Sequence, residues 1–128
     1  MNKKILIFDD DQDILNICSI ILKAKGYEVF TSMTCKDLFD TVLHADPAVI
    51  VMDNKIPETG GVEATRSIKN DLRTKHIPVI FFSANTYIAE LAKEAGTVFY
   101  IQKPFDIAAF EEILEQAFRS EYLDNKTV

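Results

Sequence analysis

Short apolar runs alternate with longer amphipathic segments along the whole chain. Continuous apolar runs of this length are typical of strands that helices cover on both faces. The four strongest runs lie at residues 5–8, 48–52, 79–82 and 98–101, and a shorter strand is expected at 28–31. Helical spacing of apolar residues fills the intervals, at about 14–25, 35–44, 62–70, 87–95 and 107–120. This pattern predicts five βα units, and therefore an α/β domain with a doubly wound, five-stranded parallel sheet.

The expected helix ends agree with this division. Gly26 and Gly96 follow the first and fourth helical patterns, where glycine commonly ends a helix. Asp106 is placed to cap the last helix, and Phe105 with Phe110 fits the N′ and N4 positions of a hydrophobic staple. We expect one domain over residues 1–120, then a polar tail at 121–128 that frays, with no output domain after it.

Reactive side chains stand where four of the apolar runs end. Asp9 and Asp10 follow the first run, Asp53 the second and Ser83 the third, and Lys103 comes two residues after the fourth. Parallel strands share one carboxyl edge, and open α/β sheets bind ligands at that edge. Three carboxylates, a hydroxyl and an ammonium should therefore meet there, as in a site for a divalent cation and a phosphoryl group.

The carboxylates differ in what they indicate. Oxygen ligands without His or Cys nearby favour Mg²⁺ or Mn²⁺ over Zn²⁺. Asp53 directly follows five apolar residues, and a charge buried there needs partners, which a cation and Lys103 would supply. The same surroundings would make Asp53 a nucleophile toward phosphorus. For Asp11 and Asp13 we favour a simpler role, stabilisation of the following helix start.

Composition limits the class of protein. The 128 residues suffice for one domain with a substantial core, and 48% apolar with 27% charged residues is ordinary for a globular protein. A net charge of -6 argues against direct binding of nucleic acid or anionic membranes. Cys18 and Cys35, both expected in helices, match no metal spacing and indicate free thiols in a reducing cytoplasm. No segment resembles a membrane span or a signal peptide.

In these motifs the chain resembles the receiver domains of response regulators in two-component signalling. The resemblance runs from Lys4 to about Ser120. It rests on four stretches, at residues 5–11, 53–57 with Gly61, 83–84 and 103–105. Each stretch alone is weak evidence for the family, but all four together, in order at the ends of alternating strands, are strong evidence. The resemblance implies the flavodoxin-like (βα)5 fold with strand order 2-1-3-4-5.

The resemblance also assigns roles to individual residues. It implies that Asp53 accepts the phosphoryl group, while Asp10, Asp53 and the Lys55 carbonyl bind Mg²⁺ and Asp9 helps through water. Ser83 and Lys103 would hold the phosphoryl group, and the Lys103–Pro104 peptide bond would be cis. Tyr100 matches the aromatic residue that turns inward when the hydroxyl moves toward the phosphate. Expected donors are a phosphohistidine of a sensor kinase or a small phosphodonor.

Some positions depart from the common pattern of the family. Ser83 replaces the usual threonine, and the segment from Ser83 to Gly96 is about two residues short. Lys55 and Asn85 stand beside the phosphoryl position and are expected to tune its hydrolysis. Val98 and Phe99 suggest an apolar patch on the fifth strand, at which a homodimer could form.

The sequence thus predicts a single-domain receiver, not an enzyme in the usual sense, that signals to a protein target in trans through its fourth helix, fifth strand and last helix. Two alternatives stay open: a phosphorelay intermediate that passes phosphate to a histidine phosphotransfer protein, and an unphosphorylated scaffold. A flavodoxin-like cofactor carrier is disfavoured because the loop after the first strand is acidic. A metal-dependent phosphatase is disfavoured because Lys55 stands where a general acid is needed.

Overall fold

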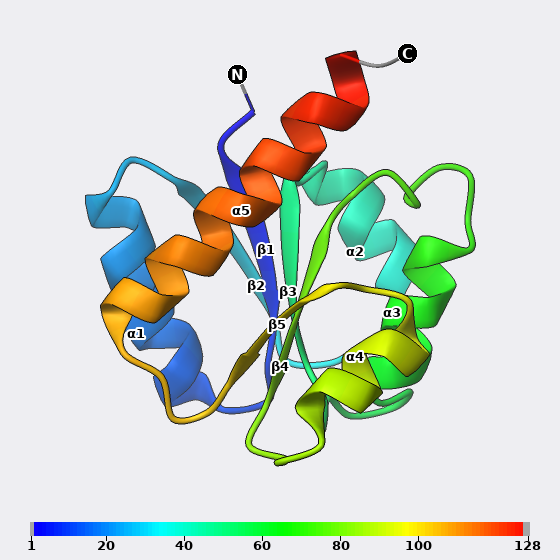
Figure 1. Ribbon diagram of the computed structural model, residues 1–128, viewed down its shortest axis with the longest axis horizontal. Helices are drawn as coiled ribbons and strands as arrows, with labels where there is room; N and C mark the ends of the chain where they lie inside the picture. Colours follow the sequence, from blue (N-terminus) through cyan, green and yellow to red (C-terminus); the bar gives the residue numbers. More distant parts are fainter. Residues whose placement is uncertain (1, 127–128) are drawn as a thin grey trace.

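The computed structural model describes residues 2–126, and for residues 121–126 it describes the backbone alone. Five strands alternate with five helices, as the sequence pattern predicts (Figure 1). In chain order they are β1 (Lys4–Phe8), α1 (Gln12–Ala24), β2 (Glu28–Ser32), α2 (Leu38–Ala45), β3 (Val49–Asp53), α3 (Gly61–Lys69), β4 (Val79–Ser83), α4 (Ile88–Ala95), β5 (Phe99–Gln102) and α5 (Ile107–Lys126).

All strand pairs are parallel, and their order is β2-β1-β3-β4-β5. The expected doubly wound flavodoxin-like sheet is thereby confirmed. The register matters for the site, because Asp53 on β3 pairs with Phe82 on β4, and Ser83 pairs with Gln102 on β5. The residues that follow these strands therefore leave the sheet at one edge.

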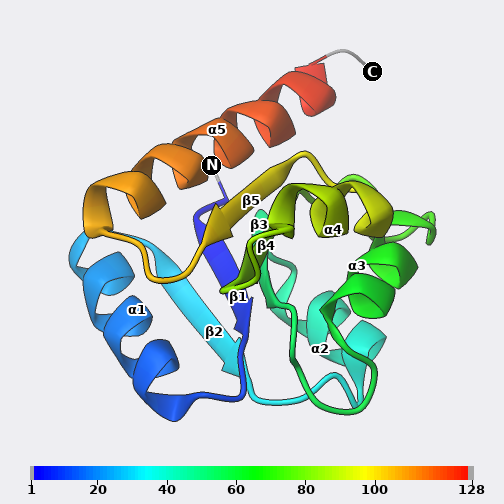
Figure 2. The same ribbon diagram turned by 60° about the horizontal axis from the view of Figure 1, so that its bottom comes forward.

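Helices cover both faces of the sheet, which explains the continuous apolar runs. Figures 1 and 2 show α1 and α5 on one face and α2, α3 and α4 on the other. Successive strand residues serve opposite cores: Ile5 and Ile7 pack toward α1 and α5, while Leu6 and Phe8 pack with residues of α2 and α3. Burial on both faces removes the apolar surface of β1, β3 and β4 from water, which is the main driving force for this fold.

The edge strand β5 differs from the expected apolar patch. Phe99 packs against the core beneath α1 and α5, whereas Val98 is 81% exposed and Tyr100 is 42% exposed. Strand alternation explains the correction, because successive side chains point to opposite faces. The exposed apolar residues of this strand region are therefore Val98 and Tyr100.

Most expected helix ends are confirmed. The Asp11 carboxylate accepts hydrogen bonds from the first turn of α1, and that of Asp106 accepts one from Ala109 N at 2.7 Å. The staple is also present, with the Phe105 and Phe110 ring centroids 5.2 Å apart.

Two helix boundaries differ from the expectation by three residues or more. Helix α2 begins at Leu38 rather than Cys35, because Ser32 and Thr34 accept hydrogen bonds from backbone N–H groups two residues on, which favours turns over helix. At the other end, α5 continues to Lys126 rather than ending near Ser120. The tail at 121–128 was expected to fray; its backbone is helical through Lys126, and residues 127–128 lie outside the described residues.

The two cysteines are free and buried, and they lie on opposite faces of the sheet. Burial raises the pKa of both thiols to about 11, and the nearby Asp9 charge adds to the effect at Cys18. Little thiolate therefore exists at pH 8, and the thiolate is the reactive form. We expect Ellman's reagent to label both cysteines slowly at pH 8 in the folded protein and rapidly when the protein is unfolded in urea. Rapid labelling of the native protein would contradict this burial.

Candidate phosphoryl-acceptor and metal site

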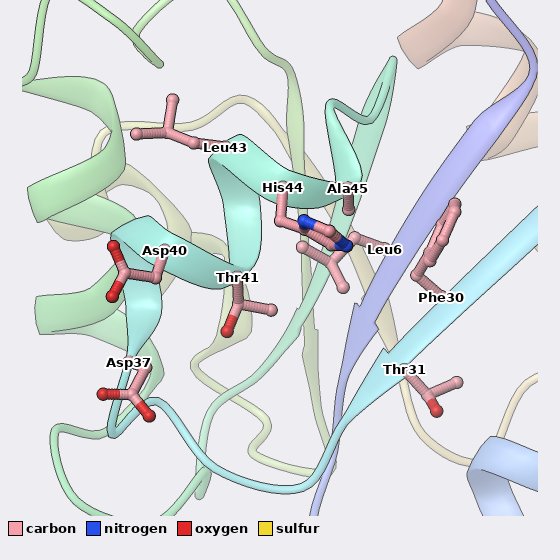
Figure 3. Close-up of a pocket in the computed structure, with 9 residues that line it drawn as sticks. All are labelled: Leu6, Phe30, Thr31, Asp37, Asp40, Thr41, Leu43, His44 and Ala45. Carbon is pink, nitrogen blue, oxygen red and sulfur yellow. The ribbon is translucent and has the colours of Figure 1, made fainter.

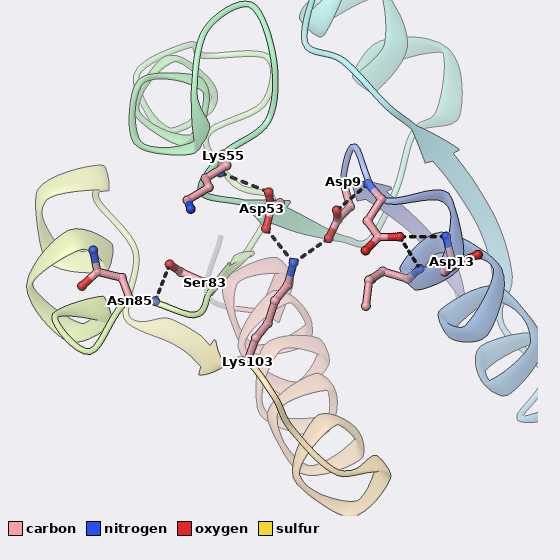
Figure 4. Close-up of polar contacts among 9 residues, drawn as sticks. Asp9, Asp13, Asp53, Lys55, Ser83, Asn85 and Lys103 are labelled. Atoms are coloured by element: carbon pink, nitrogen blue, oxygen red, sulfur yellow. Dashed lines mark hydrogen bonds and ion pairs between the residues drawn. The ribbon is translucent and has the colours of Figure 1, made fainter.

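Asp53 is the centre of a cleft at the carboxyl edge of the sheet (Figure 4). It ends the fully buried strand β3, and only 6% of its own surface is exposed. Lys103 Nζ lies 2.8 Å from Asp53 Oδ1, and the Lys55 backbone N–H donates to Asp53 Oδ2 at 3.1 Å. These two contacts fix the carboxylate plane, so the group is oriented before any substrate arrives.

Asp9 and Asp10 bring two further carboxylates to the same cleft. Asp9 is buried; its Oδ2 lies 2.9 Å from Lys103 Nζ, and its Oδ1 accepts from Asp11 N at 2.9 Å. Asp10 is exposed. One carboxylate oxygen from each of Asp9, Asp10 and Asp53 lies within 4.8 Å of the others. A small cluster of hard oxygen donors suits Mg²⁺ or Mn²⁺, so these residues fit the cation expected from the sequence.

Lys103 connects the last strand to the site. Its ammonium lies between Asp9 and Asp53 and 4.9 Å from the centre of the Phe82 ring. Its backbone N–H donates to Ser83 O at 2.8 Å, and the Lys103–Pro104 bond is cis, as expected. One lysine thus contacts two carboxylates that are far apart in the sequence, that of Asp9 directly after β1 and that of Asp53 at the end of β3.

The electrostatics of the cleft favour an added cation. Burial raises the pKa of the Asp53 carboxyl, and Asp9 raises it further, although the Lys103 hydrogen bond acts in the opposite direction. For Lys103, burial alone would lower the pKa, but hydrogen bonds to Asp53 and Asp9 outweigh it and raise the pKa. The Lys103 ammonium pairs with two of the three clustered carboxyl groups, and a divalent cation would relieve the remaining repulsion.

Ser83 and Asn85 form the opposite side of the cleft. Ser83 is buried, and its Oγ accepts from Asn85 N at 3.0 Å. The Asn85 side chain points away from Asp53 in Figure 4, and its Oδ1 accepts from Tyr87 N at 2.7 Å. The Lys55 ammonium makes no ion pair with Asp53 in the described part of the chain.

The cleft therefore gathers most of the residues selected from sequence: Asp9, Asp10, Asp53, Lys55, Ser83, Asn85 and Lys103 all line it. Tyr100 does not line the cleft and is instead half-exposed on β5. Asn54 and Ala84 also line the cleft, and sequence reasoning did not select them. Each directly follows a strand and lies within a stretch that carries the family resemblance, at residues 53–57 and 83–84.

Gly61 shapes the cleft from behind, and its steric role was not apparent in the sequence. A Cβ at this position would lie 2.7 Å from the Asn54 Cα and closer still to the Asp53 carbonyl oxygen. The Gly61 N–H donates to Asn54 O at 2.8 Å, which closes the loop after β3. The glycine thus lets the start of α3 approach the backbone of the central carboxylate. The pair Gly60-Gly61 was the available signal.

A second hollow lies between β2 and α2, away from these residues (Figure 3). Its lining mixes apolar Leu6, Phe30 and Leu43 with polar His44. Asp37 and Asp40 project from the start of α2 away from His44, and no metal-binding group was found there among the described residues. This hollow has no arrangement of groups comparable to that around Asp53.

Comparison with known proteins agrees with this geometry. The family model for the response regulator receiver domain matches residues 5–115. The polar-differentiation response regulator DivK of Brucella ovis is 29% identical over 117 residues, which cover 90% of this chain and 95% of DivK.

Solved structures are similar as well. The receiver domain of a Pseudomonas aeruginosa sensor histidine kinase, with a magnesium ion coordinated in its active site cleft, has a TM-score of 0.82 and 25% identity, over 92% of this chain and 98% of that one. NtrX of Brucella abortus has a TM-score of 0.88 and 23% identity; the match covers 99% of this chain but 29% of NtrX.

Receiver domains are signalling proteins that bind Mg²⁺ at an acidic pocket, and the cluster of Asp9, Asp10 and Asp53 provides such a pocket here. Within residues 2–126, none of the helices combines the length and apolar character needed to cross a membrane. Fold, acidic cleft and family match agree: the chain belongs to the response regulator receiver domains of two-component signalling.

Proposed function

We propose that this receiver domain accepts a phosphoryl group on Asp53 from the phosphohistidine of a sensor histidine kinase or a histidine phosphotransfer protein. The observation that carries the proposal is the Asp53 carboxylate. It is buried at the end of β3, bonded to Lys103 and to the Lys55 N–H, and within 4.8 Å of two further carboxylate groups. We infer that Asp9, Asp10 and Asp53, with the Lys55 carbonyl, hold Mg²⁺ or Mn²⁺.

The chemistry follows from these positions. A carboxylate oxygen of Asp53 attacks phosphorus, the P–N bond to the donor histidine breaks, and the imidazole nitrogen leaves with the bonding electron pair. The Lys103 ammonium, which pairs with the Asp53 carboxylate before the transfer, then pairs with one phosphoryl oxygen. The Ser83 hydroxyl donates a hydrogen bond to a second phosphoryl oxygen. A cation held by Asp9, Asp10 and Asp53 would neutralise charge on the phosphoryl oxygens. The protein contributes mainly orientation and charge, which is the larger part of catalysis in phosphoryl transfer.

The output is proposed to pass through the face formed by α4, β5 and α5, toward a protein target. Tyr87, Val98 and Tyr100 are all exposed there, although each has a large apolar side chain. Val98 and Tyr100 are two residues apart in the edge-strand region, so their side chains share one face, and exposed apolar residues that share a face commonly mark a protein-binding surface. In this proposal Tyr100 turns inward on phosphorylation and changes the face, in a cytoplasmic setting that agrees with the two free thiols.

Intact mass tests the proposal directly. We expect incubation with Mg²⁺ and acetyl phosphate to add the mass of one phosphoryl group to the wild type. Asp53→Asn should gain none, because its amide is not nucleophilic, and a metal-free sample should gain far less. Asp13→Asn is the matched control, since the side chain of Asp13 makes no hydrogen bond or ion pair within the described residues. Phosphorylation of Asp53→Asn to the wild-type level would refute the assignment.

Lys55 supplies a prediction about the lifetime of the phosphorylated state. Its side chain is exposed at the cleft, beside the proposed phosphoryl position. Its ammonium could pair with a phosphoryl oxygen and hinder approach of water, so Lys55→Asn should shorten the lifetime. The measurement is decay of the phosphorylated mass after the donor is removed. An unchanged decay rate would show that the lysine has no such role.

A further inference from the structure

The loop between β4 and α4 contains two consecutive hydrogen bonds from backbone N–H groups to side chains. Asn85 N donates to Ser83 Oγ at 3.0 Å, and Tyr87 N donates to Asn85 Oδ1 at 2.7 Å. The second bond reaches the helix itself, because Tyr87 O accepts from Leu91 N, in the first turn of α4. A continuous series of bonds therefore joins a hydroxyl in the cleft to the start of α4.

The first bond leaves the Ser83 proton available. A hydroxyl has one proton to donate and two lone pairs, and the Asn85 N–H occupies one of the lone pairs. Ser83 can therefore donate to an anion in the cleft without losing its bond to Asn85. A displacement of Ser83 would then move the Asn85 peptide with it.

The second bond adds a polar contact to an end of α4 that is otherwise held by the burial of Ile88 in the core. The helix has eight residues, and those buried are Ile88, Ala92 and Ala95. Tyr87 at its start offers no side-chain cap, whereas at the far end Arg66 Nη2 donates to Glu94 O at 3.1 Å. The end of α4 near the cleft thus depends on Asn85 for its side-chain hydrogen bond.

We propose that Asn85 is a positioning residue that couples the Ser83 hydroxyl to α4, through its own N–H on one side and its amide oxygen on the other. This differs from a role in gating water, because the amide points away from Asp53 (Figure 4) and its oxygen is already bonded. The mechanical link stands on the described contacts alone. Its use in signalling rests on the proposed phosphorylation of Asp53.

Amide hydrogen exchange measured by NMR tests the link without phosphate. Asn85→Ala should speed exchange of the Tyr87 amide by about tenfold, as expected when one hydrogen bond is lost. Asn85→Ser should restore protection, because a serine hydroxyl can also accept from the N–H two residues on. Ser83→Ala should speed exchange at both Asn85 and Tyr87. An unchanged Tyr87 amide in Ser83→Ala would overturn the coupling.

A second experiment tests the link in signalling. Amide chemical shifts of α4 are compared before and after treatment with Mg²⁺ and acetyl phosphate, scaled to the phosphorylated fraction from intact mass. Wild type, Asn85→Ser and the control Thr86→Ala should show the full change, since Thr86 is exposed and its side chain makes no hydrogen bond within the described residues. Asn85→Ala should lose at least half of it.

The outcomes separate the two proposals. A full α4 change in Asn85→Ala at equal phosphorylation would overturn the signalling role of Asn85. If the wild type takes up no phosphate, the proposed function fails, and the exchange rates in Ser83→Ala and Asn85→Ala alone decide whether the link exists.

Discussion

Lys103→Met is expected to destabilise the metal-free protein by about 3 kcal/mol at pH 7, because removal of one partner of a buried ion pair leaves uncompensated charge. Asp9 and Asp53 would remain buried beside each other, and both lose their contact with the ammonium. Urea unfolding measures the loss. Phosphorylation by acetyl phosphate should also slow at least about tenfold, since a positive charge at the transferring group is lost.

The effect of pH provides a second measure of Lys103→Met. The folded pKa of Asp53 is raised above its ordinary value of 3.8, so the folded state binds more protons than the unfolded state in the interval between them. Stability therefore rises as pH falls through that interval. Without Lys103 the pKa of Asp53 should rise further. The loss of unfolding free energy in Lys103→Met relative to wild type should therefore be smaller at pH 5 than at pH 7. Saturating Mg²⁺ should also reduce this loss.

Lys25→Met is the matched control for Lys103→Met. Lys25 pairs with Glu111 at 2.9 Å, but both side chains are well exposed, and such pairs contribute less than about 1 kcal/mol. This variant should keep nearly full stability and normal phosphorylation. Equal losses in the two lysine variants would show that burial of the acidic cleft is not what makes Lys103 important.

Gly61→Ala is expected to cost about 3 kcal/mol, at the upper end of the range for overpacking a closely packed position. The added Cβ would meet the backbone of Asp53 and Asn54, which cannot turn aside as a flexible side chain can. The loop after β3 must shift, so phosphorylation should fall as well. Urea unfolding and intact mass measure the two effects.

Gly26→Ala separates this collision from the general cost of replacing glycine. A Cβ at Gly26 would meet nothing within 4 Å, but the residue has φ +94, which costs an L-residue about 1 kcal/mol. We therefore expect a clearly smaller loss of stability and normal phosphorylation. If Gly61→Ala were no more destabilising than Gly26→Ala, the close approach of α3 to Asp53 would be wrong.

The acidic cleft and the β4–α4 loop differ in how far sequence could predict them. Asp53 and Lys103 were identified because each ends or follows a strand, and parallel strands share an edge. That Asn85 tunes hydrolysis beside the phosphoryl group stays a prediction, and the bond from Tyr87 N to its amide oxygen at the start of α4 was not foreseen. Side-chain direction in a short loop depends on local hydrogen bonds, which residue type alone does not specify.

The sequence by itself determined the order of elements, the parallel sheet and the residues at its carboxyl edge. It could do so because strand burial leaves continuous apolar runs, and a charge directly after such a run needs a partner. Only the tertiary structure decided that Lys103 contacts both Asp9 and Asp53, that Phe99 is turned into the core, and that Gly61 must lack a side chain. These facts depend on distances between segments far apart in the chain, which arise only when the sheet and its helices are packed together.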